Sequence, residues 1–276
     1  SILFGFGMAI MASRTIERER RLAMDAIAPE VSAAWNTVQW EIVREAVERR
    51  ACRAASRLIR RRGWWMLAFG LVHGIIFSGD IIGAYGLVAV IFAEVIVMRR
   101  PWLRVLVGAI IACLSLLGIW SMAAMMGREP MVLESHGPVA LDASYPLVSL
   151  TSWLIATPMT VLTALVVPCV MIGVGASRWG LLQDPRGHGA LLSSIAACGL
   201  GIGALGAVPF ALMQLDWAFV GSAAWSYPLF HASGVAGACG WLALLALVGG
   251  GPRENLGSVC AFLSAIGRRS MTAYLS

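Results

Sequence analysis

Uninterrupted apolar runs, separated by short polar segments, make up most of this 276-residue chain. Several runs continue for about 20 residues without a charge, which is the length of helix that crosses roughly 30 Å of hydrocarbon. They lack the alternation of barrel strands, and a helix satisfies its own backbone hydrogen bonds in lipid. The pattern therefore predicts an all-α fold, a polytopic integral membrane helical bundle.

The bundle is predicted to have six complete spans and a partial span at each end. Complete spans are expected at 63–78, 81–98, 103–126, 148–177, 189–213 and 227–249, and partial ones at 1–13 and from 271. These divide the chain into a partial span (1–13), an arginine-rich arm (14–62) and a transmembrane domain (63–276). Because apolar runs are cut off at both ends, we expect the sequence to be part of a longer protein.

The long polar stretch 14–62 contains twelve arginines and a helical pattern of apolar residues. Val31, Trp35, Val38 and Ile42 recur at spacings of three and four, which predicts an amphipathic helix over about 30–62. We expect this helix to lie along the membrane surface or to dock on the bundle, with the apolar stripe buried.

Composition and charge placement support a membrane location and indicate an orientation. Apolar residues are 59% of the chain and charged residues 13%, too few charges to cover a soluble domain. All the basic residues are arginine, and 20 of the 21 lie in four segments: 14–62, 99–104, 178–188 and 250–270. The positive-inside rule makes these segments cytoplasmic, and the net charge of +6 then faces a lipid bilayer rather than nucleic acid. We expect a multi-pass protein of a bacterial plasma membrane.

Small residues and prolines predict how the spans pack and bend. Gly199 and Gly203 lie four apart, and 234–240 is similarly rich in glycine and alanine, so helices can approach closely there. A glycine-lined substrate path is the alternative. Pro158 and Pro168 each remove a helix hydrogen bond, which predicts a kink in 148–177.

Two ionisable residues interrupt the first complete span and its neighbour. His73 and Asp80 are seven residues apart, so they would share a helix face if one helix continued through Ser78 and Gly79. Charge at bilayer depth is costly and usually faces a cavity or a partner. We expect the pair to line a polar cavity inside the bundle. Two alternatives stay open: Asp80 caps the following helix, and His73 simply bonds to a neighbouring helix.

Other candidate residues are more scattered. Glu94 is a carboxylate in an apolar run that can pair with a cytoplasmic arginine, and His231 is a second histidine inside a span. Arg57, Arg60 and Arg61 could hold phosphate groups, although arginines at this depth also serve as topology anchors among anionic headgroups. The six cysteines are scattered singly, so no metal site is expected.

Three blocks of sequence resemble one family. These are "LFGFGMAI", "RRRGWWMLAFGLVHGIIFSGDIIGAYGLVAV" and "GRRSMTAYLS". They resemble the YeiB-like membrane proteins, the domain of unknown function 418. The middle block matches the family pattern LFGLxH…GDIL…YGLLG at Phe69, Gly70, His73, Gly79, Asp80, Tyr85 and Gly86. In the last block Ala273 stands where asparagine is usual.

The family is mostly uncharacterised and is distantly similar to transmembrane acyltransferases such as heparan-glucosaminide acetyltransferase. That similarity implies acyl-CoA as a donor substrate and a small-molecule or glycan acceptor across the membrane. Tyr85, Glu94 and His231 are the candidate substrate-binding residues. The histidine best supported in those enzymes aligns upstream of Ser1, so its role is not carried onto His73. A proton-coupled transporter and a non-catalytic scaffold remain alternatives. The protein could form an oligomer in any of these roles.

The arginine distribution makes a testable prediction about topology. Segments 14–62 and 178–188 should be cytoplasmic, whereas 127–147 and 214–226 should be external. A membrane-impermeant thiol reagent added outside cells should label a cysteine at position 144 but not at position 56 of the full-length protein. Labelling at position 56 alone would overturn the topology.

Overall fold

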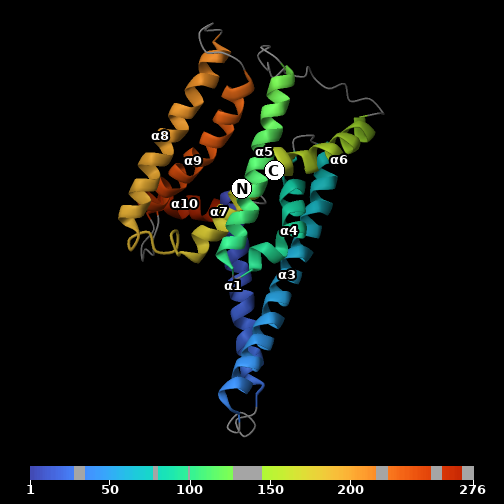
Figure 1. Ribbon diagram of the computed structural model, residues 1–276, viewed down its shortest axis with the longest axis vertical. Helices are drawn as coiled ribbons and strands as arrows, with labels where there is room; N and C mark the ends of the chain where they lie inside the picture. Colours follow the sequence, from blue (N-terminus) through green and yellow to red (C-terminus); the bar gives the residue numbers. More distant parts are fainter. Residues whose placement is uncertain are drawn as a thin grey trace.

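Helices account for all the regular secondary structure in the described part of the chain. The computed structural model describes residues 1–27, 35–76, 80–98, 100–126, 145–215, 223–249 and 257–268, and no strand occurs among them. The helices are α1 (Ile2–Asp25), α3 (Thr37–Ile76), α4 (Ile82–Val97), α5 (Pro101–Met126), α6 (Tyr145–Thr163), α7 (Val166–Arg178), α8 (Gly189–Gln214), α9 (Ala223–Gly249) and α10 (Ser258–Arg268). The predicted all-α fold is confirmed (Figure 1).

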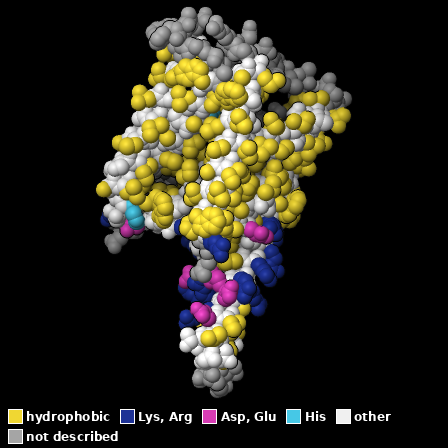
Figure 2. Space-filling view, viewed as in Figure 1, with side chains coloured by type: hydrophobic (Ala, Val, Ile, Leu, Met, Phe, Trp, Pro, Cys, Tyr) yellow, Lys and Arg dark blue, Asp and Glu magenta, His cyan; other side chains and the backbone are white. Residues whose placement is uncertain are grey.

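Four of the described helices, α5, α6, α8 and α9, are long and apolar enough to cross a membrane. The apolar helices α4 and α7 are shorter, and α10 falls in the predicted loop 250–270. Hydrophobic side chains cover most of the upper body of the molecule, whereas arginine and acidic side chains gather below it (Figure 2). This is the surface expected of a helical membrane protein. The predicted partial span from residue 271 lies outside the described residues.

The arm is an antiparallel hairpin made by the lower halves of α1 and α3 (Figure 1). Helix α1 continues past the predicted end of its apolar run to Asp25, and α3 runs for 40 residues, about 60 Å, without a break. Arg20 on α1 bonds to Glu48 on α3 at 2.5 Å. The arm is therefore held together partly by charge pairing.

The start of α3 and its apolar stripe differ from the prediction. The helix begins at Thr37, where Asn36 and Gln39 exchange side-chain-to-backbone hydrogen bonds of 2.9 Å in a reciprocal cap. Val38 and Ile42 are 62% and 59% exposed, so docking of this stripe on the bundle is wrong, whereas its burial along a membrane surface stays a prediction. The unbroken helix carries the stripe away from the bundle. Val31 lies outside the described residues.

The predicted span 148–177 consists of two helices rather than one kinked helix. Helix α6 ends at Thr163 and α7 begins at Val166, and between them Leu165 has a left-handed backbone with φ 54°. Pro158 lies inside α6, but Pro168 falls in the first turn of α7, where a missing N–H breaks no helix bond. The break is therefore at the interhelical residues and not at either proline.

Helix α4 lies at the centre of the main core. Its buried face consists of Ala84, Val88, Ala89, Ala93 and Ile96, which are at most 1% exposed. At its C-terminal end Arg178 of α7 donates to the carbonyls of Ile96 and Val97 at 3.1 Å, and Arg104 of α5 donates to the carbonyl of Met98. Cations are favourable at a helix C-terminus, so these arginines anchor α4 to two other helices.

Helices α8 and α9 meet through small residues, as the glycine spacing predicts. A Cβ on Gly199 would lie 2.5 Å from the carbonyl oxygen of Ala236, and one on Gly203 would lie 2.9 Å from the Cα of Gly237. A Cβ on Gly201 would meet nothing within 4 Å. Gly199 and Gly203 therefore permit close backbone contact, whereas Gly201 faces outward.

Replacing Gly199 by leucine should separate α8 from α9. Overpacking of a tight core costs about 1–3 kcal/mol, and here the obstacle is backbone, which cannot rotate away. The thermal midpoint of the detergent-solubilised Gly199→Leu protein should fall by several degrees. The matched control Gly201→Leu adds the same side chain to the outward face and should leave the midpoint unchanged. Equal effects of the two substitutions would contradict this packing.

Candidate functional site

His73 and Asp80 are brought together because α3 and α4 pack side by side in opposite directions (Figure 1). Helix α3 ends at Ile76 and α4 begins at Ile82, so the two residues do not share the face of one helix, and that prediction is wrong. The chain reverses direction, and the Nδ1 of His73 lies 3.0 Å from Oδ1 of Asp80. The pair therefore forms between the last turn of one helix and the residue that precedes the next.

Asp80 accepts hydrogen bonds from four groups. Besides His73, the backbone N–H groups of Ile82 and Gly83 donate to it at 3.2 and 2.8 Å, and the indole Nε1 of Trp153 donates at 3.0 Å. The Asp80 side chain is 0% exposed. The interpretation of Asp80 as the cap of the following helix is therefore confirmed, and the structure adds its bond to His73. These bonds offset the cost of burying a carboxylate.

Trp153 belongs to the site although the sequence pattern did not single it out. Tyr145 at the start of α6 donates to the carbonyl of Ile76 at 2.9 Å, which lays α6 across the ends of α3 and α4 (Figure 1). Trp153 is 7% exposed, and a Cβ on Gly74 or Gly83 would overlap its indole. The small residues Gly74 and Gly83, close to His73 and Asp80 in the sequence, are the signal that could have indicated such a close neighbour.

The geometry defines what the histidine can do. An ionised carboxylate only accepts hydrogen bonds, so Asp80 holds the proton of His73 on Nδ1 and makes Nε2 the basic nitrogen. The His73 side chain is 22% exposed, whereas Asp80 is closed off. Asp80 orients the ring, and His73 is the exposed member of the pair in the described part of the chain. The polar cavity lined by both residues stays a prediction. Such a pair can accept and return a proton.

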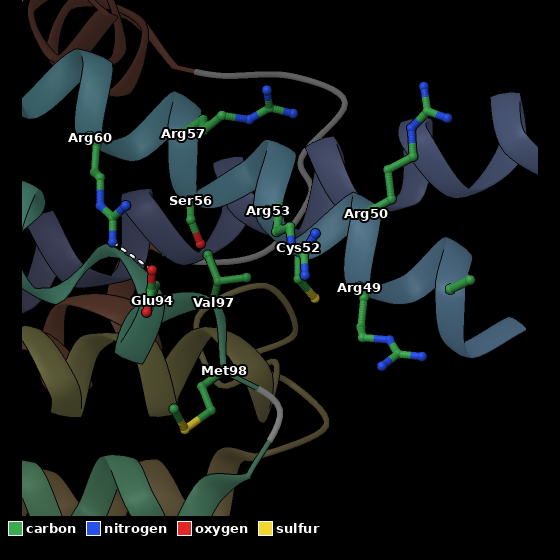
Figure 3. Close-up of a pocket in the computed structure, with 11 residues that line it drawn as sticks. Arg49, Arg50, Cys52, Arg53, Ser56, Arg57, Arg60, Glu94, Val97 and Met98 are labelled. Carbon is green, nitrogen blue, oxygen red and sulfur yellow. Dashed lines mark hydrogen bonds and ion pairs between the residues drawn. The ribbon is translucent and has the colours of Figure 1, made fainter. Parts of the chain in front are cut away.

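A second polar site lies where the arm meets the bundle (Figure 3). It is a hollow of about 1020 Å³ lined on α3 by Arg49, Arg50, Arg53, Arg57 and Arg60, and at the end of α4 by Glu94, Val97 and the capping residue Met98. We call it the arginine pocket. Arg60 bonds to Glu94 at 2.6 Å, the pairing that the sequence suggested, but the Glu94 side chain is 69% exposed rather than buried. Arg61 is also exposed and does not line the pocket.

The guanidinium groups of this pocket are spread along α3 rather than gathered at one point (Figure 3). The rise from Arg49 to Arg60 is about 17 Å. Arg49 pairs loosely with Glu45 at 3.7 Å, whereas Arg50, Arg53 and Arg57 have no ion pair among the residues that the structure describes. An elongated ligand with several anionic groups fits this spacing better than a single small anion.

Two other predicted site residues lie apart from both sites. The ring of Tyr85 stacks on Phe4 with centroids 4.8 Å apart, which makes it a packing contact between α4 and α1. His231 lies on α9, where its Nδ1 is 3.0 Å from the carbonyl of Tyr227 and its ring contacts that of Tyr227. The structure does not bring either residue to His73 and Asp80.

Within the described ranges, no three His, Cys, Asp or Glu side chains lie close enough to hold a metal ion. The sites therefore rest on one histidine–carboxylate pair and one cluster of arginines.

Together these features define a helical membrane protein with a buried His–Asp pair and a basic pocket at the base of its arm. Residues 176–276 match the model of the family described as Protein of unknown function (DUF418). That match confirms the resemblance to the YeiB-like family, and it covers α8 to α10 rather than His73 and Asp80. Comparison with curated proteins and with solved structures gives no match.

The hydrogen bond from Trp153 should contribute measurably to stability. A bond to a charged acceptor is worth about 1.5–3 kcal/mol, and Trp153→Phe removes it while keeping an aromatic ring beside the glycines. The thermal midpoint in detergent should fall by several degrees. Trp120→Phe is the control, because Trp120 is 49% exposed and should have little effect. If Trp153→Phe and Trp120→Phe lower the thermal midpoint equally, the hydrogen bond from the indole to Asp80 does not stabilise the protein.

Proposed function

We propose that this protein is a membrane acyltransferase, in which acyl-CoA bound at the arm gives its acyl group to an acceptor on the other side of the membrane. The observation that carries the proposal is the His73–Asp80 pair at 3.0 Å in an apolar bundle. A buried carboxylate that orients a histidine is an arrangement that recurs in general-base catalysis. The acceptor is a small molecule or a glycan with a hydroxyl or amino group.

His73 acts on the acceptor. Its Nε2 takes the proton of the hydroxyl or amine as that atom attacks the thioester carbonyl. A carbon–oxygen or carbon–nitrogen bond forms, the carbon–sulfur bond breaks, and the departing thiolate receives the proton from the imidazolium. Asp80 stabilises that imidazolium through the Nδ1 hydrogen bond. No metal takes part in this scheme.

The arginine pocket is the proposed site for the donor. Arg57 and Arg60 line it, and the spread of charge along α3 suits the separated phosphates of coenzyme A. From Arg60 to His73 the rise along α3 is about 20 Å. A Cβ on Gly63 or Gly70 would lie under 3 Å from α4 atoms, so the seam between the helices is closed. The thioester-bearing chain of the donor therefore follows another face of α3.

The orientation belongs to the same proposal. Acyl-CoA is cytoplasmic, and the charged arm (residues 14–62) would face that side of a bacterial plasma membrane with the bundle crossing it in several passes. The arginine distribution and the charged lower surface in Figure 2 support this placement. His73, near the far end of α3, is then accessible to an external acceptor.

Acyl transfer should depend on His73. Inverted membrane vesicles that contain the full-length protein expose the arm, so radiolabelled acetyl-CoA added outside can reach the pocket and natural acceptors are present. Label transferred to products should fall at least about 100-fold for His73→Gln, because glutamine can still donate to Asp80 but cannot accept a proton. His188→Gln should keep full activity, since His188 bonds to the backbone of Asp184 away from the site.

Two further outcomes separate the alternatives. If acyl transfer persists in His73→Gln, the His73–Asp80 pair is not catalytic. The second outcome is that no acetyl-CoA-dependent product forms and that solute movement requires both a proton gradient and His73. That result would favour a proton-coupled transporter over an acyltransferase.

A further inference from the structure

We infer that the groove between α1 and α3 is a binding site for the phosphate of an anionic phospholipid headgroup. The groove is a hollow of about 610 Å³ on a face of the arm that the arginine pocket does not use. It is lined by Gly7, Ile10, Arg14 and Arg18 of α1 and by Leu58 and Arg62 of α3. This inference does not depend on the proposed function.

The lining residues change from apolar to basic along α1. Gly7 and Ile10 come from the apolar end of the helix, and Arg14 and Arg18 follow at the helical spacing that keeps them on one face. Leu3, one turn before Gly7, is 59% exposed. A ligand in the groove thus meets hydrocarbon at one end and positive charge at the other.

The charges of the groove lack partners. Arg14, Arg18 and Arg62 make no hydrogen bond or ion pair in the part of the chain that the structure describes, although Arg20 and Arg21 nearby are paired with Glu48 and Glu17. Glu19 is the carboxylate that shares the lining, so the groove keeps a positive excess. Two arginines four residues apart repel each other, and an anion between them removes that repulsion.

A lipid fits this combination better than a soluble phosphate. Basic pockets beside membrane helices recognise anionic headgroups, because attraction to the phosphate adds to burial of the acyl chains. In the groove the phosphodiester would lie between Arg14 and Arg18, and the chains would pass Gly7 toward Leu3. A soluble phosphate compound would leave the apolar half of the groove unused.

The test is a lipid titration of the purified full-length protein in neutral detergent, followed by its thermal midpoint. Phosphatidylglycerol should raise the midpoint more than phosphatidylcholine. The double variant Arg14→Gln/Arg18→Gln should need about thirtyfold more phosphatidylglycerol for half of the effect, at about tenfold per 1.4 kcal/mol and about 1 kcal/mol per arginine. The control Arg21→Gln/Arg44→Gln removes the same charge elsewhere on the arm and should behave as the wild type.

A second variant blocks the groove without changing charge. A Cβ on Gly7 meets nothing within 4 Å, so Gly7→Phe should fold normally and fill the apolar half. It should abolish the preference for phosphatidylglycerol. If the double variant and its control need equally more phosphatidylglycerol, the lipid responds only to the general surface charge of the arm, and the proposed site is wrong. Stabilisation of the wild type by pyrophosphate at the concentration that suffices for phosphatidylglycerol would assign the groove to a soluble anion instead.

Discussion

The carboxylate of Asp80 joins three helices in a place where water is scarce. It accepts from His73 at the end of α3, from the first backbone amides of α4 and from Trp153 on α6. A carboxylate buried to this extent is tolerable only when its acceptor sites are filled. The position of α6, the start of α4 and the orientation of the histidine therefore depend on one another, and a change in any of them leaves buried charge uncompensated.

Charged side chains hold α4 at both ends. Its N-terminal amides bond to Asp80, and its last carbonyls accept from Arg178 and Arg104. The helix has 16 residues, about 24 Å, which is shorter than the roughly 30 Å hydrocarbon core. If the Arg60–Glu94 pair marks the membrane surface, Asp80 lies within the membrane. This explains why the hydrogen bonds to its carboxylate come from protein groups.

Periodicity and length predicted the helical class and the main spans, because apolar runs of about 20 residues have few alternatives in a membrane. The small-residue contact of Gly199 and Gly203 was also predictable, because close helix approach depends only on side-chain size. The break at Leu165 was not, since it arises from a single left-handed residue that propensity does not favour. Trp153 was missed because its role comes from how α6 crosses α3 and α4. The nearness of His73 and Asp80 was expected, but it arises from the antiparallel packing of two helices rather than from the face of one.

Helix α3 connects the arm to the His–Asp pair without a proline. Sharp bends in helices need a proline, a bulge or an inserted group, and α3 has no proline to provide one. It touches the backbone of α4 at both Gly63 and Gly70, seven residues apart. Two such contact points fix both the position and the direction of α3 against α4, so the orientation of the arm and the placement of His73 are set by the same seam.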